Sequence, residues 1–370
     1  MNKRDFIKTL GFAAAGVAIA NSSSALPLFF KGNRKSTWPE IWTWMGGNPS
    51  RSDDEWKSIF EKLHNAGFGG VLFESGVELL AHVAPFAQDA GIELHSWMWT
   101  LNRPADEEAK KHKDWYVVNR NGESCYDKHP YVEYYQWLCP SKEEVFQHIE
   151  KDALSRVRIP GVSGVHLDYV RYPDIILPKA LQPHYGLVQD HEMPEYDFCY
   201  CETCREKYMR KTGMDILTLP NPDLDEQWKQ YRYDSVTRFV NRLAKLVHKQ
   251  KKVISAAVFP YPELARTICR QSWNDWNLDA FFPMIYQNFY EEDIPWIGKA
   301  TRNGVRDLKG KAHLFSGFFL PDLPNEGDLS QAIHEARSNG ANGISIFEYE
   351  GLKEYQWQEI KQFYESKSIR

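Results

Sequence analysis

Residues 164–174 read GVHLDYVRYPD, an apolar run that ends abruptly in acidic, basic and aromatic side chains. Because side chains alternate along a strand, the run presents two faces, one with Val165, Leu167 and Tyr169 and the other with His166, Asp168 and Val170. His166 and Asp168 are therefore expected to point in the same direction. The segment is typical of a parallel strand whose last residues carry polar groups to one edge of a sheet.

Eight apolar runs of this kind alternate with amphipathic segments along the chain, and they begin at Glu40, Gly69, Ile92, Gly164, Val253, Ala280, His313 and Gly343. Alternating strands and helices are typical of βα units, and eight of them predict a closed (β/α)8 barrel of the TIM type. An open doubly wound sheet is the rival arrangement. It often carries a glycine-rich phosphate turn after its first strand, but here that strand ends in MGGNPS.

The clearest helix signal lies in residues 52–67, SDDEWKSIFEKLHNAG. Ser52 and Glu55 have the spacing of a capping box, and Gly67 provides the stop. Similar amphipathic patterns predict helices over residues 141–154, 225–250, 328–340 and 354–366. The stretch from Pro173 to Asp225 is then a long loop insertion after the fourth strand.

Residues 1–25 have the pattern of a secretory signal peptide, in which Lys3 and Arg4 precede the apolar run LGFAAAGVAIA. The remaining residues, 26–370, are then a single exported domain, either periplasmic or extracellular. The stretch KRDFIK resembles a twin-arginine signal with Lys3 in place of one arginine, which leaves the ordinary secretory route open. The apolar run is shorter than the roughly 20 residues that a membrane span needs. The formal charge of −5 does not suggest a nucleic-acid partner.

In a (β/α)8 barrel, the carboxyl ends of the strands and the loops after them build the active site. Carboxylates and aromatic rings converge there in this sequence, and they include Trp42, Trp44, Glu74, His95, Trp97, Trp99, His166, Asp168, Tyr286, Glu348 and Glu350. Acids paired with aromatic platforms are typical of carbohydrate chemistry. Arg171 is expected either to hold a substrate oxygen or to pair with Asp168 and merely close the strand end.

The segment GVHLDYVRYP also resembles the fourth-strand motif of family-10-like bacterial glycoside hydrolases, barrel proteins that are distantly similar to the α-amylase superfamily. The resemblance extends to residues 119–145, to DAFFPMIY at residues 279–286 and to GISIFEYEGL at residues 343–352. It implies a glycosidase that cleaves O-glycosidic bonds in oligo- or polysaccharides, with Asp168 as nucleophile and a retaining mechanism. By position, it also implies Glu263 after the fifth strand as general acid. His166 stands where α-amylases usually carry arginine.

Glycosidic cleavage needs one protonated carboxyl and one carboxylate. Burial against aromatic rings would raise the pKa of the acid, whereas Arg171 and His166 would keep Asp168 ionised. Glu263 has an alternative role as a cap of the helix that follows it, so Glu348 and Glu74 are reserve candidates for the acid. The candidate substrate-binding residues are Trp44, Glu74, His95, Trp97, His166, Arg171, Tyr286 and Glu348. No cofactor is expected for catalysis.

Three cysteines stand close together in FCYCETCREKY within the insertion: Cys199, Cys201 and Cys204. Their spacing suits a structural zinc ion, with a fourth ligand from Cys125, Cys139 or His191. Disulfides are an equal alternative in an exported protein, and free thiols are the third. A zinc ion or a disulfide would have a structural role, holding the long loop over the barrel mouth.

Two other functions remain open from the sequence. A barrel that binds carbohydrate without cleaving it would keep the aromatic platform and lack the second acid. A metal-dependent carbohydrate deacetylase would need histidine and aspartate clusters at the strand ends, for which His95 and His166 are the only support. Esterase chemistry is disfavoured because no GxSxG segment occurs.

Overall fold

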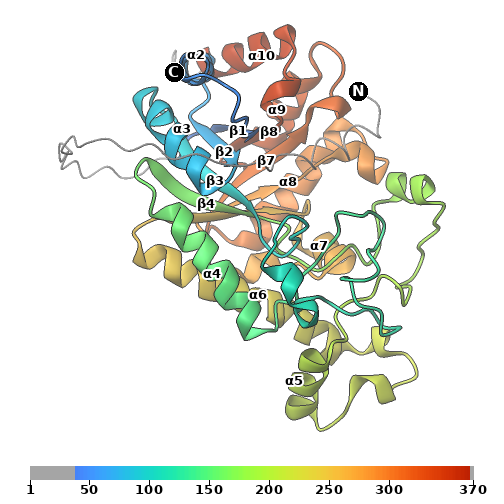
Figure 1. Cartoon of the computed structure of the whole chain (residues 1–370). Coiled ribbons are helices and arrows are strands. Elements are labelled where there is room, and N and C mark those ends of the chain that lie inside the picture. Colours follow the sequence, from blue (N-terminus) through green and yellow to red (C-terminus); the bar gives the residue numbers. More distant parts are fainter. Residues whose placement is uncertain (1–37, 367–370) are drawn as a thin grey trace, which may run out of the picture.

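The computed structural model describes residues 38–366, and the predicted signal peptide lies outside this range. Eight parallel strands close into a barrel in sequence order, with β1 next to β8. The strands are β1 (Ile41–Gly46), β2 (Gly70–Glu74), β3 (Glu93–Trp99), β4 (Val162–Asp168), β5 (Val253–Val258), β6 (Ala280–Pro283), β7 (His313–Phe319) and β8 (Gly343–Phe347). The predicted (β/α)8 barrel is confirmed (Figure 1).

Helices surround the barrel, as Figure 1 shows for α3, α4 and α6 on one side and α8 to α10 on the other. Their bounds are α2 (Asp53–Asn65), α3 (Val77–Asp89), α4 (Glu143–Val157), α5 (Glu202–Thr212), α6 (Glu226–Lys249), α7 (Pro262–Cys269), α8 (Ile294–Leu308), α9 (Asp328–Ser338) and α10 (Glu354–Glu365). The capping box of α2 is present as predicted, with Ser52 accepting from the Glu55 backbone and Glu55 accepting from the Ser52 backbone. Among the described residues, no helix is long and apolar enough to cross a membrane.

The barrel interior and the layer between strands and helices form two separate cores. The interior is unusually aromatic and is filled by Trp42, Trp44, Leu72, Trp97, Ala257, Ala280, Phe282 and Phe315. The outer core takes the alternate strand residues, such as Val165 and Leu167 of β4, together with the apolar faces of the helices. A filled interior leaves the open space to the loops at the carboxyl ends of the strands.

Strand β4 departs from the predicted alternation at its last step. His166 points inward like Asp168, as predicted, but it lies buried inside the barrel against Trp44 and Phe282. Tyr169, predicted on the outer face with Val165 and Leu167, instead lies at the barrel mouth. The reason is a left-handed backbone at Tyr169, with φ of 49°, which ends the strand and turns the ring inward. A non-glycine residue in this region is strained, and such residues often occur at functional sites.

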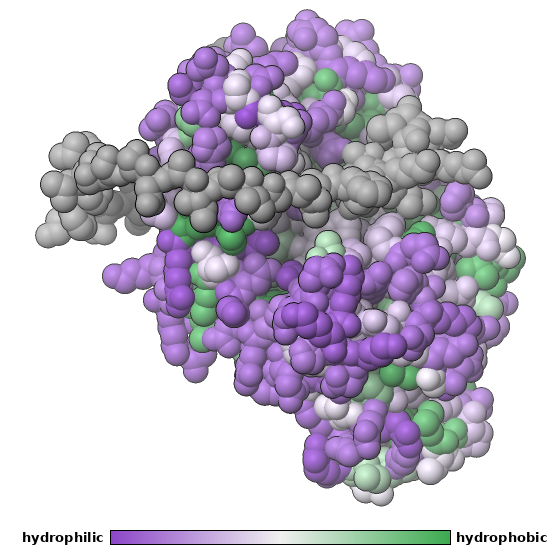
Figure 2. Space-filling view, in the orientation of Figure 1, coloured by the Kyte–Doolittle hydropathy of each residue, from purple (hydrophilic) through white to green (hydrophobic). Residues whose placement is uncertain are grey.

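Two long connections cover one side of the barrel mouth: residues 100–142 between β3 and α4, and residues 169–225 between β4 and α6. They are joined by a bridge between Asn119 and Phe198 and by a 2.7 Å hydrogen bond from the Tyr200 amide to the Val118 carbonyl. In Figure 1 they lie together below the strands, with α5 at the far end. Figure 2 shows a mainly hydrophilic surface over this region, with hydrophobic residues in small separate groups.

Candidate active site

A cavity of about 460 Å³ opens at the carboxyl ends of the strands. Four barrel strands and both long connections contribute to it. Its polar lining includes Asp168, Arg171, Asp174, His184 and Asp322, and its aromatic lining includes Trp97, Tyr131, Tyr134, Tyr135, Tyr169, Tyr185, Phe259, Tyr286, Phe289, Tyr290, Phe319 and Phe347. Pockets of this size, with a few polar groups on an apolar wall, are typical of small-ligand sites.

Asp168 lies at the base of this cavity and is 8% exposed. Its Oδ2 accepts a 3.0 Å hydrogen bond from Nε1 of Trp97, and its Oδ1 accepts a 2.7 Å bond from the Tyr169 amide. Burial raises the pKa of Asp168 to about 6, although the two hydrogen bonds and the charge of Arg171 act in the opposite direction. The carboxyl is thus poised to exchange a proton near neutral pH.

The expectation that Arg171 and His166 keep Asp168 ionised needs correction. Arg171 pairs with Asp174, at 3.1 Å between Nη1 and Oδ2, rather than with Asp168. This also rules out the simpler interpretation in which Asp168 and Arg171 pair to close the strand end. His166 is fully buried, and burial lowers its pKa well below the usual value, so its ring is neutral. Burial therefore outweighs the favourable charge of Arg171 at Asp168.

Arg171 is held firmly in the cavity wall. Its guanidinium lies 4.8 Å from the ring centre of Trp137 and 5.0 Å from that of Phe259. Its partner Asp174 accepts a second bond, of 2.9 Å, from the Tyr135 hydroxyl. A fixed arginine and carboxylate at the edge of an aromatic cavity suit the recognition of substrate hydroxyls.

Glu348 directly follows β8 and is half-buried. Burial raises the pKa of Glu348 to about 7, and the charges of Glu350 and Glu74 raise it further in the same direction. Glu74 ends β2 and still reaches solvent. The surrounding protein nonetheless raises the pKa of Glu74. The charge of Arg156 opposes this shift, and the charge of Asp168 adds to it. These interactions connect Glu348, Glu74 and Asp168 into one electrostatic group.

Tyr286 gives an independent indication that these acids face the same space. Its ring lines the cavity, and burial raises the pKa of its hydroxyl well above the usual value. The charges of Asp168, Asp322 and Glu348 act on that hydroxyl in the same direction. The Tyr286 hydroxyl therefore lies within the electrostatic reach of all three carboxyl groups.

Glu263 is placed differently. It lies exposed in the first turn of α7, and, like Glu348 and Glu74, it is not among the residues that line the cavity. The N-cap of α7 is Tyr261, without a side-chain capping bond, so the alternative prediction that Glu263 caps this helix is wrong. Charge interactions thus link Glu74 to Asp168 and Glu348 to Glu74, and Glu263 is not among the groups that act on them.

Three of the predicted substrate-binding residues lie inside the barrel beneath the cavity: Trp44, His95 and His166. Trp44 packs edge-on against Trp97 at 4.9 Å and against His166 at 4.6 Å between ring centres. His95 is fully buried 4.7 Å from Trp42, and burial lowers its pKa to about 3. These rings support the cavity floor, whereas Trp97, Arg171 and Tyr286 line the cavity itself.

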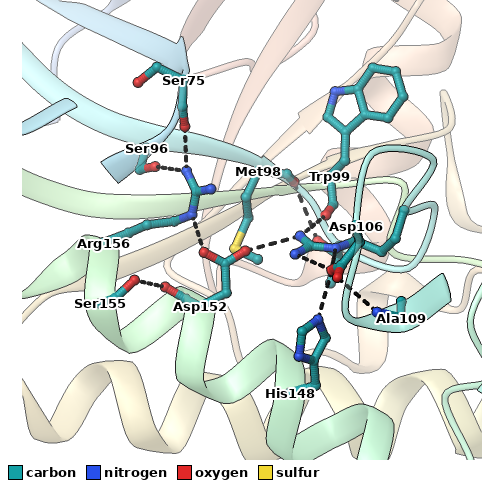
Figure 3. Close-up of polar contacts among 12 residues, drawn as sticks. Ser75, Ser96, Met98, Trp99, Asp106, Ala109, His148, Asp152, Ser155 and Arg156 are labelled. Carbon is teal, nitrogen blue, oxygen red and sulfur yellow. Dashed lines mark hydrogen bonds and ion pairs between the residues drawn. The ribbon is translucent and has the colours of Figure 1, made fainter. Parts of the chain in front are cut away.

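A network of ion pairs fixes the strand ends from outside the barrel (Figure 3). Arg156 of α4 donates to the Ser75 carbonyl at 2.8 Å, just past the end of β2, and to the Ser96 hydroxyl at 3.1 Å, in the middle of β3. Asp152 accepts from Arg156 at 2.7 Å and from Arg103 at 3.0 Å. The network thus holds the segments that carry Glu74 and Trp97 against α4.

Sequence reasoning missed most of the cavity wall, including Tyr131, Tyr134, Tyr135, Asp174, Tyr185 and Asp322. The segment HPYVEYYQW, at residues 129–137, carried a signal, because so many aromatic residues in an irregular stretch are unusual. The acids Asp174 and Asp322 gave no signal of this kind.

Four cysteines gather at the junction of the two long connections: Cys139, Cys199, Cys201 and Cys204. In the part of the chain that the structure describes, this is the one group of three or more metal-ligating side chains close enough to hold an ion. The fourth member is Cys139, one of the three candidates. Cys125 instead donates to the Tyr135 carbonyl, and His191 is exposed beside Asp190.

Neither a family model nor a curated protein sequence matches this chain. Solved structures do match. The PgaB (BpsB) glycoside hydrolase domain from Bordetella bronchiseptica aligns with a TM-score of 0.62 and 12% identity, over 88% of this chain and 97% of that one. A β-galactosidase from Marinomonas ef1 aligns at 0.61 and 10% identity, over 89% and 60%. The β-amylase catalytic domain from Paenibacillus polymyxa aligns at 0.58 and 13%, over 89% and 98%. At identities this low, the structural matches establish a shared fold and no more.

Proposed function

We propose that this chain is a glycoside hydrolase that cleaves O-glycosidic bonds in oligo- or polysaccharides, with Asp168 and Glu348 as its carboxyl pair. One observation carries the proposal: two acids with pKa values of about 6 and about 7 stand at the carboxyl ends of β4 and β8, and the charges of both act on the hydroxyl of Tyr286, which lines an aromatic cavity. A carboxyl pair with unequal pKa values is what glycosidic cleavage requires. The glycoside hydrolases among the structural neighbours support the same class.

The roles follow from the order of the two pKa values. Glu348 holds its proton to higher pH and acts as the general acid, giving that proton to the leaving glycosidic oxygen. Asp168 ionises first and acts as the nucleophile on the anomeric carbon. Water then cleaves the glycosyl ester and returns its proton to Glu348. The Trp97 and Tyr169 donors hold both Asp168 oxygens and thereby orient the carboxylate.

Substrate binding is assigned to the cavity wall. Trp97 and Tyr286 offer aromatic faces beside Asp168, and Arg171 with Asp174 offers fixed polar groups for sugar hydroxyls. The site needs no catalytic cofactor in this proposal. Export through residues 1–25 to the periplasm or the cell exterior is part of the same proposal, because an exported chain meets polysaccharides there.

The test compares the wild type with Asp168→Asn and Glu348→Gln on a panel of plant, host and bacterial glycans, with release of new reducing ends as the readout. Cleavage by the wild type that both folded variants lose supports the proposal. Glycan binding without any cleavage by the wild type would make the barrel a recognition module. NMR of the first product anomer then distinguishes retention, which we propose, from inversion.

A metal-dependent deacetylase is the weaker alternative. His95 and His166 lie buried beneath the cavity and do not line it, so they offer no ligand set at the mouth. Acetate release from acetylated glycans that a chelator abolishes would favour the deacetylase and count against the proposed glycosidase.

A further inference from the structure

The four clustered cysteines come from both long connections. Cys139 ends the connection between β3 and α4, while Cys199, Cys201 and Cys204 lie at the start of α5 in the connection between β4 and α6. All four are buried, and their Sγ atoms lie within 4.8 Å of one another. Cys139 Sγ lies 3.5 Å from Cys204 Sγ and 3.7 Å from Cys201 Sγ.

From this geometry we infer that Cys139, Cys199, Cys201 and Cys204 form a structural zinc site that clamps the two connections together. Zinc binds thiolate sulfur at about 2.3 Å in a tetrahedron, which places the sulfurs about 3.8 Å apart. The two distances from Cys139 Sγ match this edge. A disulfide would need sulfurs at about 2.0 Å. Four Sγ atoms that all lie within 4.8 Å of one another suit a central metal ion better than two separate disulfide bonds.

The surroundings can offset the charge of the site. Zinc displaces the thiol protons on binding, which leaves four thiolates, one Zn²⁺ and a net charge of −2. Cys201 is the N-cap of α5, so the positive end of the helix dipole faces the cluster. The Val118 amide donates to Cys199 Sγ at 3.4 Å. Lys142 Nζ donates a 3.0 Å hydrogen bond to the hydroxyl of Thr203, which lies between Cys201 and Cys204 in the sequence, so a cation also stands near.

Tyr172 provides one further donor and a link to the candidate active site. Its buried hydroxyl finds no hydrogen-bond partner among the described residues, and its electrostatic interactions with Cys204, Cys139 and Cys199 place it near the cluster. A buried hydroxyl beside thiolates can donate to sulfur. Tyr172 follows Arg171 directly, and its carbonyl accepts from the Arg171 guanidinium at 2.9 Å. The zinc site therefore stands directly behind the polar wall of the cavity.

Both of the connections that the zinc ion would join also contribute residues to the cavity wall. Tyr131, Tyr134 and Tyr135 come from the first, and Leu177, Leu181 and Tyr185 come from the second. Zinc would fix the position of one group of residues against the other. The metal site itself does not depend on the proposed glycosidase activity.

The test measures metal by mass spectrometry in the full chain purified from zinc-supplemented culture. We expect about one zinc per chain, retained in Cys125→Ser and Cys269→Ser and lost in Cys139→Ser and Cys204→Ser. The two control cysteines are equally buried but lie outside the cluster. A wild type without zinc, iron in its place, or zinc that survives both cluster substitutions would overturn the proposal.

A second measurement covers the case in which cluster variants do not fold. Wild type grown with Co²⁺ should show the strong visible bands of tetrahedral cobalt thiolate, and denaturation without reductant should expose all six thiols of the chain. Loss of four of these thiols to disulfides would overturn the zinc site. Neither readout requires catalytic activity, so failure of the glycosidase proposal would leave this test intact.

Discussion

The indole Nε1 of Trp97 donates a 3.0 Å hydrogen bond to Oδ2 of Asp168 across the paired strands β3 and β4. Trp97 also lines the cavity and packs edge-on against Trp44 beneath it. One side chain therefore joins the aromatic filling of the barrel to the carboxyl on which the proposed chemistry depends. The strand pairing, rather than a flexible loop, fixes this contact.

Trp97→Phe should raise the pKa of Asp168 and lower kcat/KM. The substitution keeps an aromatic ring but removes a donor that stabilises the ionised form. A hydrogen bond to a charged group contributes about 1.5–3 kcal/mol, which corresponds to roughly one to two units of pKa. The acid limb of the pH profile should move upward by about that amount. An unmoved limb with an unchanged rate would show that the contact does not tune Asp168.

The activity should peak in a narrow window between pH values of about 6 and about 7. Asp168 must be ionised, so activity rises as pH passes its pKa of about 6. Glu348 must be protonated, so activity falls as pH passes its pKa of about 7. The profile of kcat/KM for the free enzyme measures both limits. A plateau that extends well above pH 8 would contradict the role of Glu348.

Glu348→Gln and Glu263→Gln should differ sharply. General acid catalysis contributes about 10²–10⁴ to the rate, so the first should lose activity on that scale and lose the basic limb of the profile. Glu263 lies exposed on α7 and is not among the groups whose charges act on Glu74 or Glu348, so its variant should stay within about twofold of the wild type. The reverse pattern would restore the assignment of Glu263 that the family resemblance implied.

The barrel was predictable because each strand is an apolar run with its own boundaries. The predicted run over residues 313–319 coincides with β7, and most other strands begin within one residue of the expected position. Strand β4 begins at Val162, two residues early, because Val162 and Ser163 continue the pairing without a strong apolar signal. Hydrophobic periodicity thus indicates the strands, and the count of eight indicates closure.

The site was less predictable because it depends on pairings between distant residues. Arg171 stands three positions from both Asp168 and Asp174, and only the fold decides that it pairs with Asp174. The ionisation of Asp168 depends on how much water the aromatic walls exclude, which no local pattern reports. Glu348 was a reserve candidate because it ends a strand, whereas Glu263 was favoured by position alone.

Arg171→Met should destabilise the fold by about 3–5 kcal/mol. It would leave Asp174, which is 3% exposed, as a buried carboxylate without its cation. The double variant Arg171→Met with Asp174→Asn should recover a large part of the loss, because the unpaired charge is gone. Urea unfolding of the wild type, both single variants and the double variant measures this. Equal losses in Arg171→Met and the double variant would show that packing against Trp137 and Phe259 matters more than the ion pair.

The stability of Asp168→Asn, compared with that of the wild type, should increase as pH rises. The pKa of Asp168 is raised on folding from an ordinary value of 3.8 to about 6, so the folded state holds a proton that the unfolded state releases between those values. The free energy of unfolding of the wild type therefore falls by about 3 kcal/mol at most as pH rises from about 4 to about 6. Asparagine does not titrate, so the variant lacks this loss. The difference in the free energy of unfolding between variant and wild type, measured in urea at pH 4 and at pH 7.5, should shift by about 2–3 kcal/mol in favour of the variant. A difference that does not change with pH would mean that Asp168 has an ordinary pKa, and the proposed division of roles with Glu348 would then lose its basis.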